Sequence, residues 1–180
     1  PGGAGRSMSN PAAYSDPDKM TSKYYYSDVS DNGGVHTNSG INNKAAYLLV
    51  DGGTFNGKTV TAIGADKALA IYYEVQTNLL TSGADYADLY NALYQGCLNL
   101  VGGASGVVFG DCQQVRNAAD AVEMSQNPAV AGFRTDPPLC SNGLMPTYTF
   151  KDDLEGGISN WTFVNGSTTR WQYGSPYGAF

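Results

Sequence analysis

The stretch that decides the fold reads Asp31-Asn-Gly-Gly-Val-His36-Thr-Asn-Ser-Gly-Ile41-Asn-Asn-Lys44-Ala-Ala-Tyr47-Leu48. It begins with a turn, because the paired glycines Gly33-Gly34 tolerate backbone angles that other residues resist. The apolar residues that follow recur at helical spacing, at Ile41, Ala45, Leu48 and Leu49. Asn38 or Ser39 can cap this helix, and Gly52-Gly53 stops it. The stretch therefore predicts a short helix that is entered through a glycine turn.

Three further helices are predicted downstream. The first covers roughly residues 64–80, where helical spacing places on one face Leu69, Tyr72, Tyr73, Gln76, Leu79 and Leu80. Asp85 can cap the next, which Gly102-Gly103 ends, with an inward face of Leu89, Leu93, Cys97 and Leu100. The last opens at Asp111, where Gln114 resembles the partner of a capping box, and its inward face is Cys112, Val115, Ala119 and Val122. Four such helices predict a mainly α fold with a bundle-like core.

Proline-containing pairs mark a boundary after the helices. Asn127-Pro128 and Met145-Pro146 interrupt the pattern, because proline neither continues a helix nor supplies a ladder donor. Beyond them, short aromatic and β-branched runs alternate with Gly, Asn and Ser, as strands do. The expected organisation is a helical lobe over 1–126 that includes a long loop region over 1–38, a Pro-rich linker over 127–146 and the truncated start of an all-β, sandwich-like domain over 147–180.

The three cysteines, Cys97, Cys112 and Cys140, form no Cys-x-x-Cys metal motif, and a disulfide is their favoured use. Pairing Cys97 with Cys112 would join the last turn of the third helix to the first turn of the fourth. A loop of that size stabilises a fold by about 3 kcal/mol and indicates an oxidising compartment. Cys140 is then unpaired. Buried free thiols are the alternative.

The composition excludes two classes of partner. With a net charge of -6 and a pI near 4.5, the chain lacks the basic surface that binds nucleic acid or anionic lipid. No apolar stretch approaches the roughly 20 residues that span a bilayer, so membrane insertion is not expected. The chain starts at Pro1 without an initiator Met and stops at Phe180 in mid-pattern, so we expect a piece of a longer protein.

His36 is the only histidine, and Asp31 precedes it across the glycine turn. A carboxylate folded back by such a turn can accept the Nδ1–H of the imidazole and favour the protonated ring. A protonated imidazole can in turn stabilise an oxyanion. The alternative is a hydrogen-bonded surface pair without a catalytic role.

The stretch from Asp31 to Leu48 resembles the segment that carries the second catalytic histidine in thermolysin-like zinc metallopeptidases. Arg6-Ser-Met-Ser-Asn-Pro11 and Asp16-Pro-Asp18 resemble the segment that precedes it in that family, in both order and separation. Gly64-x-Asp66-Lys67 and Ile71-Tyr72-Tyr73 also fit. The resemblance implies the helical C-terminal lobe of a secreted endopeptidase that acts on peptide or protein substrates.

This resemblance covers about residues 5–125 and implies a role for three residues. His36 would hydrogen-bond the developing oxyanion, Asp31 would orient His36, and Arg6 would bind a substrate carbonyl beyond the scissile bond. In this family zinc is held by a His-Glu-x-x-His helix and a further glutamate. One histidine cannot build that motif, so the resemblance implies no metal ligand in this chain. It implies that the zinc ligands and the general base lie in a missing N-terminal half, that this chain is inactive alone and that the parent binds calcium.

One departure from the family concerns the substrate pocket. Gly5 stands where the family tends to place a larger apolar residue beside Arg6, so the pocket for the residue after the cut is expected to differ. The second functional hypothesis is an inactive secreted adhesion or substrate-binding module, in which Trp161, Trp171 and Tyr173 stack on sugars or hold protein surfaces. A purely structural secreted domain is the third.

Overall fold

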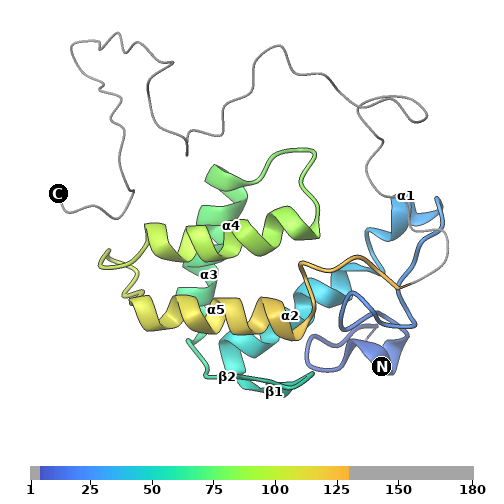
Figure 1. The fold of residues 1–180 in the computed structure, drawn as a ribbon, viewed down its shortest axis with the longest axis horizontal. Coiled ribbons are helices and arrows are strands. Elements are labelled where there is room, and N and C mark those ends of the chain that lie inside the picture. The colour runs from blue at the N-terminus through green and yellow to red at the C-terminus, as the bar shows by residue number, and fades with distance from the viewer. Residues whose placement is uncertain (1–4, 130–180) are drawn as a thin grey trace, which may run out of the picture. The chain divides into compact units, whose positions relative to one another are not determined.

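The computed structural model describes residues 5–129, which form a helical domain (Figure 1). The elements follow one another as η1 (Pro11–Tyr14), α1 (Asp31–Gly34), α2 (Ser39–Asp51), β1 (Gly53–Phe55), β2 (Lys58–Val60), α3 (Ala65–Glu74), the π-helical turn η2 (Val75–Leu79), α4 (Tyr86–Asn99) and α5 (Phe109–Ala121). The predicted mainly α fold class is confirmed. The β domain expected over 147–180, the linker beyond residue 129 and Cys140 lie outside the described residues.

Helix α2 begins and ends as predicted, but neither predicted cap is made. It runs from Ser39 to Asp51, and Gly52 follows with a φ of 75°. The Asn38 side chain bonds the backbone of Tyr26 instead of the helix. The Ser39 hydroxyl donates to the carbonyl of His36. Contacts with the preceding loop thus outcompete the local cap.

A β-hairpin that the sequence pattern did not predict connects α2 to α3. Strands β1 and β2 pair antiparallel, with Phe55 opposite Lys58. Asn56 and Gly57 form the two-residue turn with positive φ angles of 48° and 76°. Such a turn matches the twist of the strands, and Asn-Gly is its usual sequence. The signal for this hairpin is therefore present in the sequence.

Helix α3 and η2 together occupy the predicted range, but the predicted face is only partly correct. Tyr72, Leu79 and Leu80 pack against the core, whereas Gln76 is exposed. Leu69 and Tyr73 are 70% and 68% exposed, whereas Ala68, Ile71 and Val75 are buried. Every position from 68 to 73 holds an alanine, an aliphatic or an aromatic residue, so helical spacing fits two adjacent stripes. Packing against the other helices decides which stripe is buried.

Helix α4 starts with a capping box in which Asp85 is the capping residue, as predicted. The Asp85 carboxylate accepts from the N–H groups of Ala87 at 2.8 Å and Asp88 at 3.0 Å. The Asp88 carboxylate accepts from the Asp85 N–H at 3.1 Å. These bonds satisfy donors that the first helical turn leaves unpaired.

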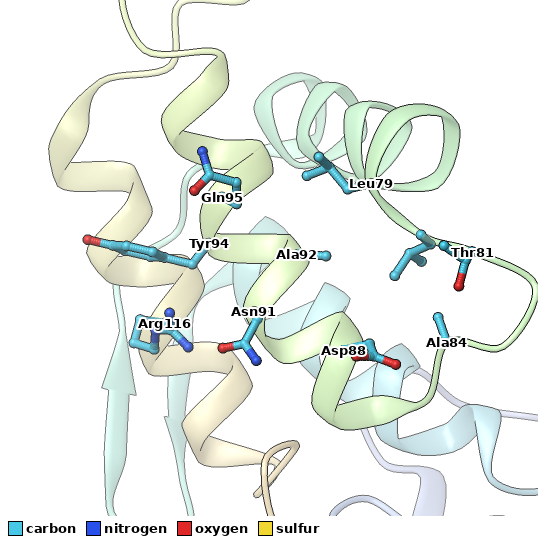
Figure 2. A pocket seen from close by; sticks show the side chains of 10 residues that line it. Leu79, Thr81, Ala84, Asp88, Asn91, Ala92, Tyr94, Gln95 and Arg116 are labelled. Carbon is cyan, nitrogen blue, oxygen red and sulfur yellow. The ribbon is translucent and has the colours of Figure 1, made fainter. Parts of the chain in front are cut away.

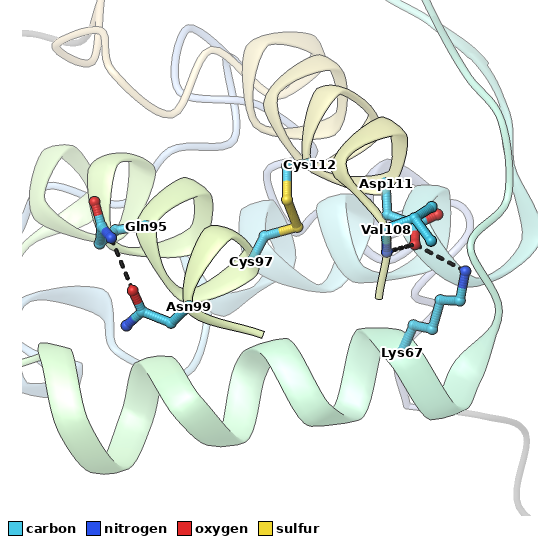
Figure 3. Close-up of a disulfide and its surroundings, with 7 residues drawn as sticks. All are labelled: Lys67, Gln95, Cys97, Asn99, Val108, Asp111 and Cys112. Carbon is cyan, nitrogen blue, oxygen red and sulfur yellow. Dashed lines mark hydrogen bonds and ion pairs between the residues drawn. A yellow bond between two sulfur atoms is a disulfide. The ribbon is translucent and has the colours of Figure 1, made fainter. Parts of the chain in front are cut away.

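Helix α5 begins at Phe109, so the predicted cap at Asp111 is wrong. The Asp111 carboxylate lies inside the first turn, where it accepts from the Val108 N–H at 2.9 Å and from Lys67 Nζ at 2.8 Å (Figure 3). Gln114 bonds the loop before α3 and closes no capping box. The ion pair with Lys67, which is distant in sequence, favours this placement of Asp111. The predicted inward face of α5 is buried as expected.

Cys97 in the last turn of α4 and Cys112 in the first turn of α5 form a disulfide (Figure 3). Their Cα atoms lie 5.5 Å apart, and both residues are fully buried. Helices α4 and α5 lie side by side (Figure 1). The cross-link closes a short loop and is expected to stabilise the fold by about 3 kcal/mol, because it restricts the unfolded chain.

The chain after α5 returns to the N-terminal loop (Figure 1). The Glu123 carboxylate accepts hydrogen bonds from Lys19 Nζ at 2.8 Å, from Asn56 Nδ2 at 2.9 Å and from the N–H and hydroxyl of Thr21. Burial by itself would raise the pKa of Glu123, but the hydrogen bonds outweigh burial and lower the pKa to about 2. Glu123 thereby ties the N-terminal loop and the hairpin to the end of α5.

Gly96→Ala is expected to destabilise the domain by about 1–3 kcal/mol. A Cβ at Gly96 would lie 2.6 Å from Val75 Cγ2, and the β-branched Val75 has little freedom to move away. Gly110→Ala is the matched control, because nothing lies within 4 Å of a Cβ there and alanine favours the helix. Chemical denaturation of both variants measures the difference. Unchanged stability of G96A would contradict the close packing of α4 on η2.

Glu123→Gln is expected to remove an acid-sensitive part of the stability. The folded-state pKa of about 2 lies below the usual 4.5, so the carboxylate stabilises the fold at neutral pH. This contribution, roughly 2–3 kcal/mol, is lost as the pH falls from the usual pKa towards the folded one. Denaturation midpoints measured from pH 7 to pH 2 should therefore fall less steeply for E123Q than for the wild type.

Asp51→Asn serves as the control for this measurement, because Asp51 is an exposed carboxylate at the end of α2. It should leave the acid dependence of stability nearly unchanged. Parallel pH curves for the wild type and E123Q would show that Glu123 does not tie these segments together.

Candidate active site

Helix α1 is a single turn that winds left-handed. All four of its residues have positive φ angles, 56° at Asp31, 49° at Asn32, 80° at Gly33 and 84° at Gly34. The Val35 N–H closes the turn on the Asp31 carbonyl at 3.0 Å. Aspartate, asparagine and glycine are the residues that visit this region, at a cost of roughly 1–2 kcal/mol for each non-glycine residue. Surrounding contacts must offset that strain.

The two glycines of the turn have different surroundings. Gly33 is exposed, and nothing lies within 4 Å of the place where a Cβ would stand. Gly34 is buried, and a Cβ there would lie 2.7 Å from Asn38 Nδ2 and 3.0 Å from the ring of Tyr26. Both positions favour glycine because of their positive φ angles, but only at Gly34 does close packing also exclude a side chain.

The turn brings together the two side chains that the sequence predicts as a pair. The Asp31 carboxylate bonds His36 Nδ1 with one oxygen. With the other it accepts from the N–H groups of His36 at 3.1 Å and Thr37 at 3.3 Å. The hydrogen bond with His36 is the main cause that lowers the pKa of Asp31 below its usual value. The carboxylate thus remains ionised and fixes the ring from the Nδ1 side.

The imidazole of His36 is oriented towards solvent while the carboxylate that holds it is largely covered. The His36 side chain is 73% exposed and that of Asp31 is 26% exposed. Because Nδ1 is bound to Asp31, Nε2 is the ring nitrogen left to meet a ligand. A hydrogen-bond donor held in place by a carboxylate suits stabilisation of a negative oxygen.

Arg6 lies next to the same segment. Its Nη1 donates to the Ser39 hydroxyl at 2.7 Å, and that hydroxyl donates to the His36 carbonyl at 2.6 Å. The loop that carries Arg6 is also held by Lys44, whose Nζ donates to the Ser9 carbonyl at 2.7 Å. Ser39 and Lys44 were missed as supporting residues, since bonds between residues so distant in sequence leave no local pattern.

The side chains that most often bind metals are dispersed over the described residues. Within residues 5–129, no group of three or more His, Cys, Asp or Glu side chains is placed to hold an ion. The ligand set for a catalytic zinc, three protein side chains and a water, therefore does not fit this part of the chain. In the same range, no helix has the length and apolar character needed to cross a membrane.

Among the surface grooves of residues 5–129, two lie beside the helices and are lined by neither His36 nor Asp31. One of about 510 Å³ lies behind the turn and is lined in part by Tyr25, Asn38 and Tyr86. The other, of about 480 Å³, lies between η2 and α4 (Figure 2). Its charged groups have internal partners, because Asp88 closes the capping box and Arg116 lies over Tyr94, 4.5 Å from the ring centroid.

Comparison with known proteins identifies the family. The family model for the alpha-helical domain of thermolysin metallopeptidases matches residues 1–124. The chain belongs to this family. The resemblance carried by the histidine segment is thereby confirmed.

Individual relatives agree with this assignment. A bacillolysin of Bacillus cereus is 50% identical over 111 residues, which are 60% of this chain and 19% of the relative. A thermolysin of Alicyclobacillus acidocaldarius subsp. acidocaldarius is 46% identical over 121 residues, 67% of this chain and 21% of the relative. A zinc metalloproteinase of Renibacterium salmoninarum is 41% identical over 124 residues, 65% of this chain and 22% of the relative. The chain thus spans about a fifth of the length of these relatives.

Gly34→Ala is expected to destabilise the domain by about 2–4 kcal/mol, and Gly33→Ala by about 1 kcal/mol. Both variants carry the cost of a side chain in a left-handed conformation. G34A adds the clash with Asn38 and Tyr26. Urea denaturation of the two variants tests the geometry of the turn, and equal losses would contradict it.

Proposed function

We propose that the chain is the C-terminal catalytic lobe of a secreted zinc endopeptidase that hydrolyses peptide bonds. In this proposal His36 stabilises the oxyanion of the tetrahedral intermediate, Asp31 orients His36, and Arg6 binds a carbonyl of the substrate. The observation that carries the proposal is the Asp31–His36 pair, held on a strained turn with the imidazole exposed. Membership of the thermolysin metallopeptidase family supports it.

The proposed chemistry of His36 follows from its hydrogen bonds. When a peptide carbonyl is attacked, negative charge develops on its oxygen, and a donor already in place lowers the energy of that state. Asp31 accepts the Nδ1–H of His36, which leaves Nε2–H to donate to the oxyanion. The ring need not reorganise during the reaction, because the carboxylate itself is held by two backbone N–H groups.

Arg6 supplies a second positive group on the same side of the domain. Its guanidinium has further N–H groups besides the one bonded to Ser39, and these can donate to a substrate carbonyl. Because Ser39 also bonds the His36 carbonyl, the spacing between the guanidinium and the imidazole segment is constrained. We propose that this spacing matches adjacent carbonyl groups of a bound peptide.

The zinc site of the proposed enzyme lies in a preceding part of the protein. A His-Glu-x-x-His helix and a further glutamate would hold the metal there, and the glutamate of the motif would act as general base. The printed name of the Renibacterium relative, a zinc metalloproteinase, supports zinc as the cofactor. The 180-residue chain alone should neither bind zinc tightly nor cleave peptides. We propose on the family resemblance that the parent protein also binds calcium. The disulfide supports export of the protein to an oxidising compartment.

Replacing His36 by Ala in the complete, zinc-loaded peptidase is expected to lower kcat by roughly ten-fold to a thousand-fold. Zinc content should not change, because His36 is not a ligand in this proposal. Val35→Ala is the matched control, since Val35 is an exposed neighbour without a proposed role. Peptide hydrolysis and metal analysis are measured on the same preparations.

Three other results would overturn parts of the proposal. Loss of zinc with H36A would make His36 a ligand. Unchanged zinc and unchanged turnover would leave His36 a structural residue and favour the adhesion-module hypothesis, whose aromatic residues lie outside the described range. Absence of a His-Glu-x-x-His motif upstream would favour the same alternative.

A further inference from the structure

Asn38 lies directly behind the left-handed turn and is only 6% exposed. Its side-chain oxygen accepts from the Tyr26 N–H at 2.9 Å, and its Nδ2 donates to the Tyr26 carbonyl at 2.8 Å. The same Nδ2 approaches the Gly33 carbonyl at 3.5 Å. One buried amide therefore connects the turn to the loop before it. A buried polar side chain whose donors and acceptor are all used restricts its neighbours to one arrangement.

The backbone of Asn38 is fixed as well. Its N–H donates to the Gly34 carbonyl at 2.7 Å, which continues the chain from the turn into α2. Its carbonyl accepts from the hydroxyl of Tyr86 at 2.7 Å. Asn38 is two residues beyond His36. Its side-chain and backbone bonds therefore fix the C-terminal end of the segment that carries the imidazole.

Tyr86 brings the rest of the domain into this arrangement. It is the first residue of α4, directly after the capping residue Asp85, and α4 is joined to α5 by the disulfide. Burial raises the pKa of Tyr86, so its hydroxyl stays protonated and keeps donating. The bond from Tyr86 therefore links the histidine segment to the first turn of a helix whose last turn is joined to α5 by the disulfide.

We propose that Tyr86 and Asn38 are positioning residues that hold the Asp31–His36 turn in its strained conformation and so keep the imidazole at one place and in one tautomer. This inference rests on the proposed role of His36 and goes beyond it. The physical reason is the strain itself, since consecutive residues with positive φ persist only where surrounding contacts over-determine them. Asn38 provides such contacts directly, through its bonds to the carbonyls of Gly33 and Gly34. Tyr86 acts through Asn38, because its hydroxyl holds the Asn38 carbonyl.

Tyr86→Phe is the decisive variant, because it removes one hydroxyl and leaves the ring in place. Tyr72→Phe is its matched control. Tyr72, like Tyr86, is partly buried, and its hydroxyl also donates to an asparagine of the same region, Asn42, at 2.8 Å. That bond does not involve Asn38, which is the residue that holds the turn. A general loss of stability would affect both variants alike, whereas positioning of His36 would be lost only in Y86F.

The first readout is the NMR spectrum of the imidazole in the full 180-residue chain, where His36 is the only histidine. At alkaline pH the wild type should show one set of signals, mainly from the Nδ1–H tautomer. Y86F should raise the Nε2–H fraction roughly three- to ten-fold, as expected when about one hydrogen bond of positioning is lost. Y72F should leave these signals unchanged. Equal spectra for Y86F and Y72F would overturn the proposal.

A second pair of variants tests Asn38 directly. Asn38→Asp keeps the acceptor for Tyr26 but loses the Nδ2 donor. Asn42→Asp makes the same chemical change in α2, at a partly buried asparagine whose side-chain oxygen accepts from Tyr72. N38D should perturb the imidazole signals and N42D should not. The two variants are compared at temperatures equally far below their unfolding midpoints. Perturbation by N42D of the same size would show that the effect is general. If N38D is unfolded, the comparison of Y86F with Y72F alone decides.

The third readout is turnover by the complete zinc-loaded peptidase. Y86F should lower kcat roughly three- to ten-fold with little change in KM, because small misplacement of a transition-state donor leaves substrate binding intact. Y72F should keep both constants. If Y86F alters the imidazole spectrum while H36A leaves turnover unchanged, the positioning stands and the proposed role of His36 fails. If H36A lowers turnover while Y86F matches Y72F, the role of His36 stands and the positioning proposal fails.

Discussion

Four consecutive positive φ angles between Asp31 and Gly34 are the constraint on which the site depends. A right-handed or extended path through these residues would carry the Asp31 carboxylate away from the ring of His36. The left-handed turn instead folds it back, so that one oxygen meets Nδ1 and the other accepts two backbone N–H groups. Two of the four residues are not glycine, so the turn is strained and other parts of the domain must hold it.

The helical domain meets that requirement through contacts between distant segments. Helix α2 continues from the turn, and close packing at its start leaves no room for a side chain at Gly40, where a Cβ would lie 2.4 Å from the Pro17 carbonyl. Helix α4 is held to α5 by the disulfide, and Glu123 ties the end of α5 to the N-terminal loop. The loop that carries Arg6 and the turn that carries His36 are therefore both held by bonds to the helical domain, which is what the proposed role in stabilising a transition state requires.

The parts of this arrangement that are local in sequence could be predicted. The Asp-Asn-Gly-Gly composition predicts an unusual turn, and Asp85 predicts the start of α4 from the residue type that caps helices. The face of α3 could not be predicted, since Leu69 and Tyr73 fit helical spacing as well as the buried residues do. The hairpin at Asn56-Gly57 was missed although its turn sequence is typical. Asp111 was misassigned because its partner, Lys67, lies on another helix.

The candidate site likewise has parts that are local in sequence and parts that depend on how the helices pack. Asp31 and His36 could be paired from the sequence because they lie five residues apart across one turn and bond each other directly. The family resemblance could be recognised because its motif is contiguous. Local residue types thus determined the turn, the range of α2, the start of α4 and the identity of the pair. Only the tertiary structure decided that Ser39 joins Arg6 to the histidine segment and that Asn38 and Tyr86 stand behind it, because those bonds connect residues whose proximity arises only when the helices pack.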